Sequence, residues 1–479
     1  MPHPLPRGLA AALAMALLAA ASAPAQETLA PPAPTTATAL DDYVAAAGTE
    51  FAWRVLTERA YDDRTELVLE MTSQRWRADE EVSRGVWRHW VSLVVPKRAT
   101  AETALLFITG GANDKDPPRG GSGLIRTVAL STNTVCAVLN CVPNQPTVVY
   151  DSDEPDRPRY EDDLLAATWN RFADTGDPTW LAQLAMAKSA VRAMDAVQEA
   201  VADVDGAPAI ERFTVAGASK RGWTTWLAAI VDDRVAGIAP IVIDLLNIGP
   251  SMRHHLACYG EWSRALKDYD KQGVADKLGK PAGDAILSIV DPYRYRERLT
   301  LPKVMVNASG DEFFLPDSSR FYYDDLVGEK HLSYTPNTGH GLGDTNALET
   351  VVAFHASVAQ GLERPSVRWT GPDDAGEHVA AEYVAAEYAV RCSAEPVEAV
   401  LWRAVNAKAR DFRHPVVGDA FQSTPLEPDA DGAYRVDVTA PPSGFAAVFA
   451  RFTFDIGAAV PWRVSTPVWI APDIEPFGD

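Results

Sequence analysis

Six apolar runs separated by helix-like segments constrain the fold of this chain more than any other feature. The runs, in order within residues 101–361, are TALLFITGG, NTVCAVLNCVP, ERFTVAGAS, VAGIAPIVID, LPKVMVNASGD and HLSYTPNTGH. The segments with helical periodicity and length are DLLAATWNRF, LAQLAMAKSAVRAMDAVQEAV and GDTNALETVVAFHASVAQGL. Strands that alternate with helices through short connections are typical of a parallel sheet covered by helices. The sequence therefore predicts an α/β fold with a mostly parallel sheet.

Three other segments depart from this alternation. Residues 40–95 alternate apolar and polar positions and are rich in Trp and Val, which indicates an antiparallel entry to the sheet. Residues 247–299 follow a strand and are rich in His, Tyr, Trp and Arg, so we expect a cap over the carboxyl edge of the strands. After residue 364, short strand-like runs between turns predict a small C-terminal β-sandwich. The expected domains are residues 40–364, including the cap, and residues 365–479.

The first residues have the features of a secretory signal peptide. Arg7 precedes the apolar run from Leu9 to Ala21, and Ala23-Pro24-Ala25 has the small-x-small pattern of a cleavage site. We expect a signal peptide over residues 1–25, a disordered linker over residues 26–39, and a periplasmic or secreted protein. A retained N-terminal anchor is the alternative. No later apolar stretch reaches the length of a membrane span.

The formal net charge of -21 argues against some classes of partner. Nucleic acids and anionic membranes are bound through clustered Lys and Arg, and this sequence has no basic tract. Four cysteines in 479 residues do not make a disulfide scaffold. Cys136 and Cys141 lie five residues apart in one strand-like run, too far apart to pair with each other. Cys258 and Cys392 stay open as disulfide candidates.

No stretch has the ligand spacing of a metal site. The acidic run YDSDEPDRPRYEDD, residues 150–163, lacks the pattern of an EF-hand, so a solvated loop is preferred to a calcium site. The pair His254-His255 also lacks a metal-ligand pattern. We therefore expect neither a metal nor a cofactor.

The stretch VAGASKRGWTTWLAAIV, residues 215–231, predicts a sharp turn from a strand into a helix, with Ser219 at the turn. This is the context of the nucleophile elbow of α/β-hydrolases, whose usual pattern is Gly-x-Ser-x-Gly. Gly217 fits the pattern, but Arg221 stands where the second glycine belongs, and Gly222 follows one position late. The alternative is a serine that only caps the following helix.

Two further residues complete a candidate catalytic triad in the chain order Ser, Asp, His that α/β-hydrolases use. Asp311 follows the apolar run LPKVMVNASG, where an acid that orients the base belongs, and Glu312 and Asp317 follow closely. His340 lies in PNTGHGLGD, a glycine-flanked loop between a strand and a helix. The alternatives are an aspartate that only caps or turns the chain and a structural histidine.

The loops around the serine also supply candidate donors for an oxyanion. One donor is the backbone N–H of Lys220, and the other belongs to Gly110, Gly111 or Ala112 in the loop after TALLFITGG. An ordinary turn is the alternative for that loop. The side chain of Lys220 has three possible roles: it assists the oxyanion, attracts an acidic substrate, or forms a salt bridge with a surface carboxylate.

Longer motifs extend beyond the triad over most of the chain after the signal segment. They are SQRWR, WRHW, LLFITGG, PNQP, AGASKRGWTTWL, VIDLLN, YGEWS, LPKVMVNASGDEFFLPDSS, FYYDDLVGEKHLSYTPNTGHGL and RDFR. With these motifs the sequence resembles the PhoPQ-activated pathogenicity-related protein family. The resemblance implies an α/β-hydrolase-like fold with a small C-terminal β-domain, and a triad of Ser219, Asp311 and His340. It also implies a distant similarity to prolyl-peptidase-type and acetyl-ester-hydrolysing enzymes, and it makes the Lys-Arg pair after the serine a family trait.

The leading hypothesis is an exported serine hydrolase that cleaves a peptide, amide or ester bond in a small-molecule or peptide substrate. The distant similarity to peptidases favours the peptide or amide bond slightly. The rival hypothesis is a secreted signalling or binding protein on a hydrolase scaffold, with catalysis lost or incidental. A third is an envelope-stress factor whose C-terminal β-domain recruits a partner. The sequence leaves the oligomeric state open.

Overall fold

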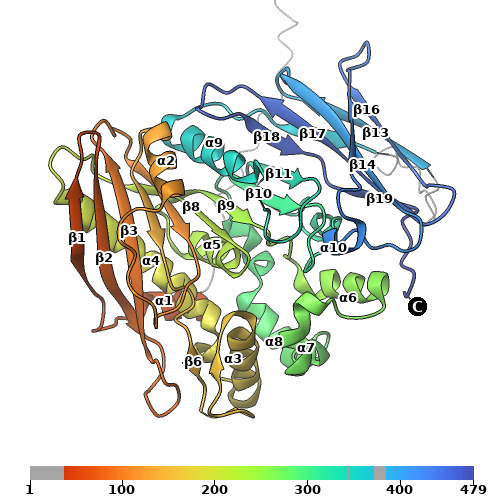
Figure 1. Ribbon diagram of the computed structural model, residues 1–479. Coiled ribbons are helices and arrows are strands. Elements are labelled where there is room, and N and C mark those ends of the chain that lie inside the picture. The colour runs from red at the N-terminus through yellow and green to blue at the C-terminus, as the bar shows by residue number, and fades with distance from the viewer. Residues whose placement is uncertain (1–36, 151, 344, 372–384, 479) are drawn as a thin grey trace, which may run out of the picture. The chain divides into compact units, whose positions relative to one another are not determined.

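One long mixed sheet runs through the computed structural model (Figure 1). The structure describes residues 37–150, 152–343, 345–371 and 385–478. In these residues the middle of the sheet is parallel, in the spatial order β5 (Cys136–Leu139), β4 (Thr103–Ile108), β8 (Arg212–Ala218), β9 (Val235–Ile241), β10 (Lys303–Ala308) and β11 (Lys330–Thr335). Five of these strands lie within the apolar runs, and β11 begins one residue before its run, at Lys330. The predicted parallel sheet is therefore confirmed.

Antiparallel strands extend the parallel sheet on both sides. On one side are β1 (Ala52–Ala60), β2 (Arg64–Arg75) and β3 (Val86–Pro96), and β3 pairs with β5. On the other side β18 (Trp462–Ser465) pairs with β11 and is followed by β17 (Phe445–Phe454), β14 (Glu398–Asn406) and β15 (Gln422–Pro425), while β19 (Trp469–Ala471) pairs with β17. The first group is the antiparallel entry that the sequence predicts.

The C-terminal region, residues 365–479, contains two facing sheets among its described residues. A second sheet of β12 (Val367–Thr370), β13 (Ala385–Cys392) and β16 (Tyr434–Thr439) shares a core with β17. Val390 and Val436 from this sheet are buried together with Val448 and Phe452 of β17. The predicted β-sandwich is confirmed. The sequence did not reveal that one of its sheets continues the central sheet through the pairing of β18 with β11.

Helices cover both faces of the sheet. α1 (Ala39–Ala45), α4 (Ala182–Ala202) and α5 (Lys220–Val231) share one core, whereas α2 (Gly123–Thr132) and α9 (Ala347–Gln360) belong to the core on the other face (Figure 1). The parallel strands are buried almost without interruption, because side chains on both faces meet a helix. The chain order and this layering make the architecture an α/β-hydrolase fold, as predicted.

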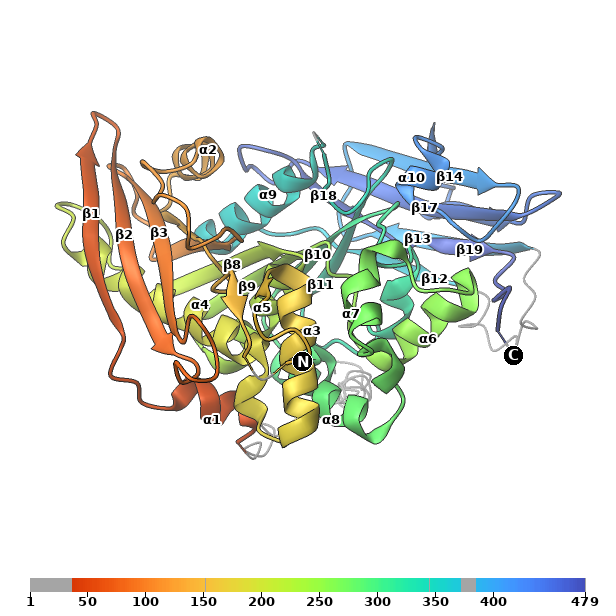
Figure 2. The same cartoon turned by 60° about the horizontal axis from the view of Figure 1, so that its bottom comes forward.

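A group of helices stands at the carboxyl edge of the parallel strands, in front of the sheet in Figure 2. Between β9 and β10 the chain forms α6 (Ile248–Tyr259), η2 (Arg264–Leu266), α7 (Lys267–Lys271), η3 (Ala275–Lys277), α8 (Pro281–Val290) and η4 (Pro292–Arg298). The connection from β5 to β8 adds β6 (Thr147–Val148), β7 (Pro158–Arg159), α3 (Glu161–Thr175) and η1 (Pro178–Trp180) before α4. The remaining short elements are η5 (Ser318–Phe321) and α10 (His414–Val417). We call residues 247–299 the cap.

From Thr38 onward the chain forms one compact unit. The predicted signal peptide, residues 1–25, and residues 26–36 of the predicted linker lie outside the described residues. Among the described residues, no helix has both the length and the apolar character that crossing a membrane requires.

Candidate active site

Ser219 lies at the turn between β8 and α5, in a backbone conformation that few residues other than glycine adopt. Its φ is 58° and its ψ is -124°. Its amide donates a hydrogen bond of 2.8 Å to the carbonyl of Ile241 on the neighbouring strand, which helps to hold the turn in place. The hydroxyl makes no capping bond to α5, so the interpretation of Ser219 as a helix cap has no contact to support it.

Two glycines make this turn possible, and they explain the unusual motif. A Cβ at Gly217 would lie 2.6 Å from the carbonyl oxygen of Arg221, and one at Gly222 would lie 2.7 Å from Ile243 Cγ2. Both distances are too short for non-bonded atoms. The close approach to the neighbouring strand therefore occurs at position 222, and position 221 is free to carry a large side chain.

Arg221 points away from this strand and is held by a partly buried ion pair. Its guanidinium donates two hydrogen bonds to Glu161, at 2.7 and 2.6 Å, and one of 2.5 Å to the carbonyl of Val142. A Cβ at Gly110 would lie 2.3 Å from Arg221 Nη2, so this glycine makes room for the guanidinium. We refer to residues 110–112, which hold the candidate donors, as the oxyanion loop. Burial acts to raise the pKa of Glu161, but Arg221 and Lys220 outweigh it and lower the pKa to about 2.

Lys220 has a partner of its own at the start of α3. Its Nζ lies 3.0 Å from Asp162 and 3.3 Å from Glu161, and the hydroxyl of Tyr269 also donates to Asp162. Of the three roles considered for this side chain, the structure shows the salt bridge. The backbone N–H of Lys220 begins α5 and has no acceptor within the helix, so it stays available as an oxyanion donor.

The interpretation of the acidic run as a solvated loop is wrong for its last residues. Glu161, Asp162 and Asp163 form the first turn of α3, and each pairs with a basic side chain. Their partners lie up to 60 positions away, so spacing along the chain gave no sign of the contact. The negative charges at this helix N-terminus are also favourable for the helix dipole.

Asp311 and His340 meet as the sequence predicts. His340 Nδ1 lies 2.9 Å from Asp311 Oδ2, and the imidazole of His340 packs on Phe313 with ring centroids 4.3 Å apart. Asp311 is 4% exposed and also accepts a hydrogen bond from the Phe313 amide. Glu312, the neighbouring acid, accepts the backbone N–H of His340 at 2.6 Å. A proton on Nδ1 facing the carboxylate leaves Nε2 as the free base.

The third contact of the predicted triad is not made in this structure. In the described residues no hydrogen bond joins Ser219 Oγ to His340.

The oxyanion loop runs beside the serine, because Ile108 at the end of β4 pairs with Gly217. The carbonyls of Gly110 and Gly111 are held by the amide of Cys141 and the side chain of Gln145, and Ala112 follows them in the same loop.

Ser219 opens into a pocket whose far wall is the cap. The pocket's cavity volume is about 70 Å³. One wall consists of Trp169 of α3, Trp223 of α5 and the loop residues Ile243, Leu245, Phe313 and Phe314, and the cap supplies Ile248, Met252, Trp262, Leu266, Tyr269, Val274, Ala275 and Leu278. Asp162 and Lys220 also line it. A concave apolar pocket with a few polar groups is the usual form of a small-molecule site.

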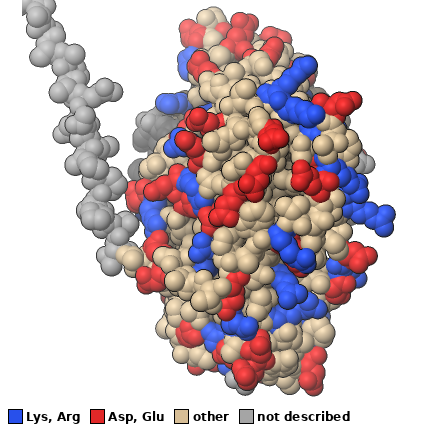
Figure 3. Space-filling view, turned by 90° about the vertical axis from the view of Figure 1, so that its left-hand side faces the viewer, with Lys and Arg blue, Asp and Glu red and all other residues tan. Residues whose placement is uncertain are grey.

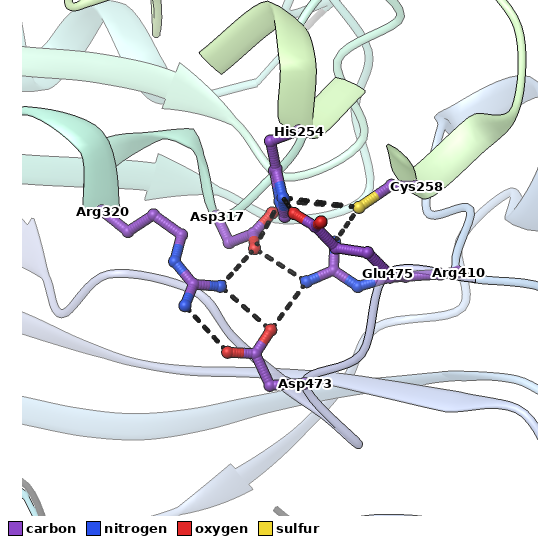
Figure 4. A network of polar contacts seen from close by, with 7 residues as sticks. All are labelled: His254, Cys258, Asp317, Arg320, Arg410, Asp473 and Glu475. Carbon is purple, nitrogen blue, oxygen red and sulfur yellow. Dashed lines mark hydrogen bonds and ion pairs between the residues drawn. The ribbon is translucent and has the colours of Figure 1, made fainter. Parts of the chain in front are cut away.

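A network of buried charges holds the cap helix α6 against the end of the chain (Figure 4). Asp317 accepts hydrogen bonds from His254 at 3.1 Å and from Arg410 at 3.0 Å, and Arg410 also bonds to Asp473. Glu475 lies 2.5 Å from the other nitrogen of His254. Burial acts to lower the pKa of His254, but the carboxylate of Asp317 outweighs it and raises the pKa to about 10.

Three residues of this network have side chains of the kinds that bind metals. The ligand atoms of His254, Cys258 and Glu475 lie within 4.8 Å of one another. However, Arg410 donates to Cys258 Sγ at 2.9 Å, so a guanidinium occupies the side of the sulfur that a cation needs. Sγ is 3.6 Å from both nitrogens of His254, which places it opposite the ring rather than next to one lone pair. The donor geometry favours an ion-pair network over a metal site.

Asp244 is a further residue of this region that the sequence did not single out. It lies just after β9, is 3% exposed, and accepts hydrogen bonds of 2.5 Å from the hydroxyls of Tyr322 and Tyr334. Burial raises its pKa to about 7, and the charges of Asp311 and Asp317 act in the same direction. The sequence feature that could have pointed to Asp244 is its position, since it is a polar residue that closely follows an apolar strand.

The chain is similar to a curated protein over most of its length and, more distantly, to solved structures of esterases. Autocrine proliferation repressor protein A of Dictyostelium discoideum is 37% identical over an alignment of 464 positions that covers 92% of each chain. Acetyl xylan esterase 1 from Thermoanaerobacterium sp. JW/SL YS485 is 15% identical with a TM-score of 0.43, over 67% of this chain and 93% of that one. A glucuronoyl esterase from Solibacter usitatus is 14% identical with a TM-score of 0.40, over 67% and 91%.

The two esterase structures are too distant to indicate a substrate. The sequence itself matches the PhoPQ-activated pathogenicity-related protein family over residues 40–413, a span that includes the turn at Ser219, both other triad candidates and the cap. The protein therefore belongs to the PhoPQ-activated pathogenicity-related protein family.

Proposed function

We propose that this protein is an exported serine hydrolase with Ser219 as nucleophile, His340 as general base and acid, and Asp311 as the residue that orients His340. The observation that carries the proposal is the contact of 2.9 Å between Asp311 and His340, at the sheet edge where Ser219 occupies a strained turn. A nucleophile, a base and an orienting acid from three separate loops are the parts of a triad.

In this mechanism Ser219 Oγ attacks the carbonyl carbon while His340 Nε2 accepts the hydroxyl proton. The tetrahedral intermediate collapses, the bond to the leaving group breaks, and Nε2 gives the proton to that group. Water then attacks the acyl-enzyme in the same way and releases the acid. Asp311 stabilises the imidazolium formed in each half, and the Lys220 amide with an N–H of Gly111 or Ala112 stabilises the oxyanion.

The proposal requires the imidazole of His340 to move toward Ser219. His340 pivots about its contact with Asp311, and its side chain is 19% exposed, which leaves it room to turn. Catalytic hydrogen bonds often tighten only when substrate binds.

The reaction requires an acyl group, and both an ester and a peptide or amide bond provide one. The pocket beside Ser219 suits a small molecule or the side chain of a short peptide. We propose no nucleic-acid partner, because the net charge is -21; on the face over β1 to β3, acidic and basic side chains are interspersed (Figure 3). Export is proposed from the features of the first 25 residues.

A fluorophosphonate probe tests the nucleophile directly. We expect one molecule of probe to label the wild-type protein covalently and Ser219→Ala to stay unlabelled, with ester hydrolysis reduced by at least about 10³-fold. Ser288→Ala is the matched control, since Ser288 is exposed on α8 and away from the site. Mass spectrometry of the labelled peptide identifies the residue. Equal labelling of wild type and Ser219→Ala contradicts the proposal.

A second candidate function rests on the relative in Dictyostelium discoideum. That protein is named for autocrine repression of proliferation, and it matches 92% of this chain. A signalling role can use this fold without catalysis. If Ser219→Ala retains full biological activity in a cell assay while losing probe labelling, signalling is the function that the chain performs and hydrolysis is incidental.

A further inference from the structure

The pocket beside Ser219 is built from aromatic and aliphatic side chains that the proposed reaction does not use. Trp169 and Trp223 meet edge to face with ring centroids 5.9 Å apart, and Tyr269 lies 5.8 Å from Trp169. Met252 and Leu278 of the cap close the other side. The cavity volume of about 70 Å³ is several times the roughly 10–15 Å³ that one water molecule needs, so the methyl of an acetyl group would fill only part of the pocket.

The two charged groups among the described lining residues neutralise each other. Lys220 Nζ lies 3.0 Å from Asp162, and the hydroxyl of Tyr269 donates to the same carboxylate. A substrate carboxylate in the pocket would have no free cation to pair with, and a substrate amine would have to displace Lys220. Burying an unpaired charge is costly, so a charged group is excluded.

The position of the triad decides which part of a substrate enters the pocket. Ser219 lines it, whereas Asp311 and His340 do not. His340 must protonate the leaving group, so the leaving group departs on the His340 side. The acyl group, bonded to the attacked carbonyl, therefore points into the pocket.

We propose that the pocket is an acyl-binding site for a large uncharged apolar group, of the size of a hexanoyl or 3-phenylpropanoyl chain. This inference rests on the proposed hydrolase function and adds its substrate class. The cap sets the preference, because most of the far wall comes from it. Acetyl esters are poor substrates, and acyl groups that end in a carboxylate or an ammonium are rejected.

Hydrolysis of p-nitrophenyl esters with one leaving group and varied acyl chains measures this preference. We expect kcat/KM to rise about fourfold per methylene from acetate through butyrate to hexanoate. The 3-phenylpropanoate is expected to match hexanoate, and the monosuccinate, which ends in a carboxylate, to fall below acetate. A preference for acetate, or equal rates for hexanoate and monosuccinate, overturns the proposal while leaving the hydrolase function in place.

A large side chain placed in the cap wall tests where the preference arises. Ala275 lines the pocket and is half-buried, so Ala275→Phe narrows the pocket with little strain on the fold. We expect kcat/KM for hexanoate to fall at least about tenfold while the value for acetate changes less than about twofold. Ala285→Phe makes the same change at an exposed position of α8 and should behave as wild type. An unchanged chain-length profile in Ala275→Phe overturns the proposal.

A binding measurement keeps the inference testable if no ester is hydrolysed. Ser219→Ala protein is titrated with 3-phenylpropanamide, 3-phenylpropanoate and 3-phenylpropylamine, and tryptophan fluorescence reports occupancy near Trp169 and Trp223. We expect the neutral amide to bind at least about tenfold more tightly than either charged compound, and Ala275→Phe to abolish the difference. If the amide binds selectively but wild type hydrolyses none of the esters, the proposed hydrolase function is contradicted and the pocket assignment stands. If all three compounds bind equally, the pocket assignment is contradicted and the hydrolase function stands.

Discussion

Asp244 carries a buried carboxyl group between two tyrosine hydroxyls, within electrostatic reach of the acid of the candidate triad. The hydrogen bonds from Tyr322 and Tyr334 favour its charged form, but burial outweighs them and raises the pKa to about 7. Near neutral pH this residue therefore changes its charge in the folded protein. The negative charge it gains lies close to Asp311.

The titration of Asp244 makes the free energy of unfolding depend on pH. Its pKa rises from 3.8 to about 7 on folding, so its contribution is present in full below pH 3.8 and is lost as the pH rises through about 7. We expect wild type to lose stability relative to Asp244→Asn between pH 5 and pH 8 on this account. Urea denaturation across that range measures the difference. Parallel curves for the two proteins contradict the assignment, and Asp437→Asn, at an exposed site, should follow wild type.

At the scale of elements, the contact between α3 and α5 holds the turn that carries Ser219. Glu161 at the start of α3 binds the guanidinium of Arg221, which is in the first turn of α5. Arg221 in turn fills the space beside Gly110 in the oxyanion loop. One ion pair thus fixes the relative positions of the turn at Ser219 and the loop that contains the candidate oxyanion donors.

Glu161→Gln tests this contact. Glutamine keeps the shape of the side chain but removes the charge that faces a buried guanidinium, so we expect the free energy of unfolding to fall by about 1–3 kcal/mol. We also expect slower ester hydrolysis, because the turn loses its support. Glu154→Gln removes an exposed carboxylate paired with Arg157 and should cost less than about 1 kcal/mol. Similar losses of unfolding free energy in the two variants would show that the contact between Glu161 and Arg221 stabilises the fold no more than an exposed ion pair does.

The elements themselves were predictable to different degrees. The six parallel strands could be read from the sequence because each is buried on both faces and forms a continuous apolar run. Ser219, Asp311 and His340 could be named as candidates, since each lies at the end of one of these strands or in the loop after it. The partners of Lys220 and Arg221 could not, because Glu161 and Asp162 are distant in the sequence and their run also fits a solvated loop. Ion pairs leave no periodic signal along a chain.

At the scale of the whole molecule, the end of the chain fastens the cap. The amide of Phe477 donates to the carbonyl of Ala257 in α6, and its ring lies against Gly260, where a Cβ would be 2.9 Å from Phe477 Cδ1. Glu475 adds its contact with His254. α6 also contributes Met252 to the pocket beside Ser219. The last residues are therefore connected to the pocket through one helix.

Deletion of residues 475–479 should loosen α6 without unfolding the core. We expect amide hydrogen exchange in residues 254–260 to accelerate by about 5- to 30-fold, the equivalent of about 1–2 kcal/mol, while amides of α9 keep their protection. Hydrogen exchange followed by mass spectrometry resolves these segments. Unchanged exchange in α6 would show that the tail does not hold the cap, and a loss of protection throughout would show that it supports the whole fold.

The pairing of β18 with β11 also determines what happens if the C-terminal region is removed. Removal at residue 365 would leave β11 as the last strand of a long hydrophobic sheet, with unpaired amides and carbonyls facing water. Such an open edge is a template for pairing with another chain. The C-terminal region thus protects the sheet against self-association, and precipitation of a shortened protein would report the exposed edge rather than the loss of a partner.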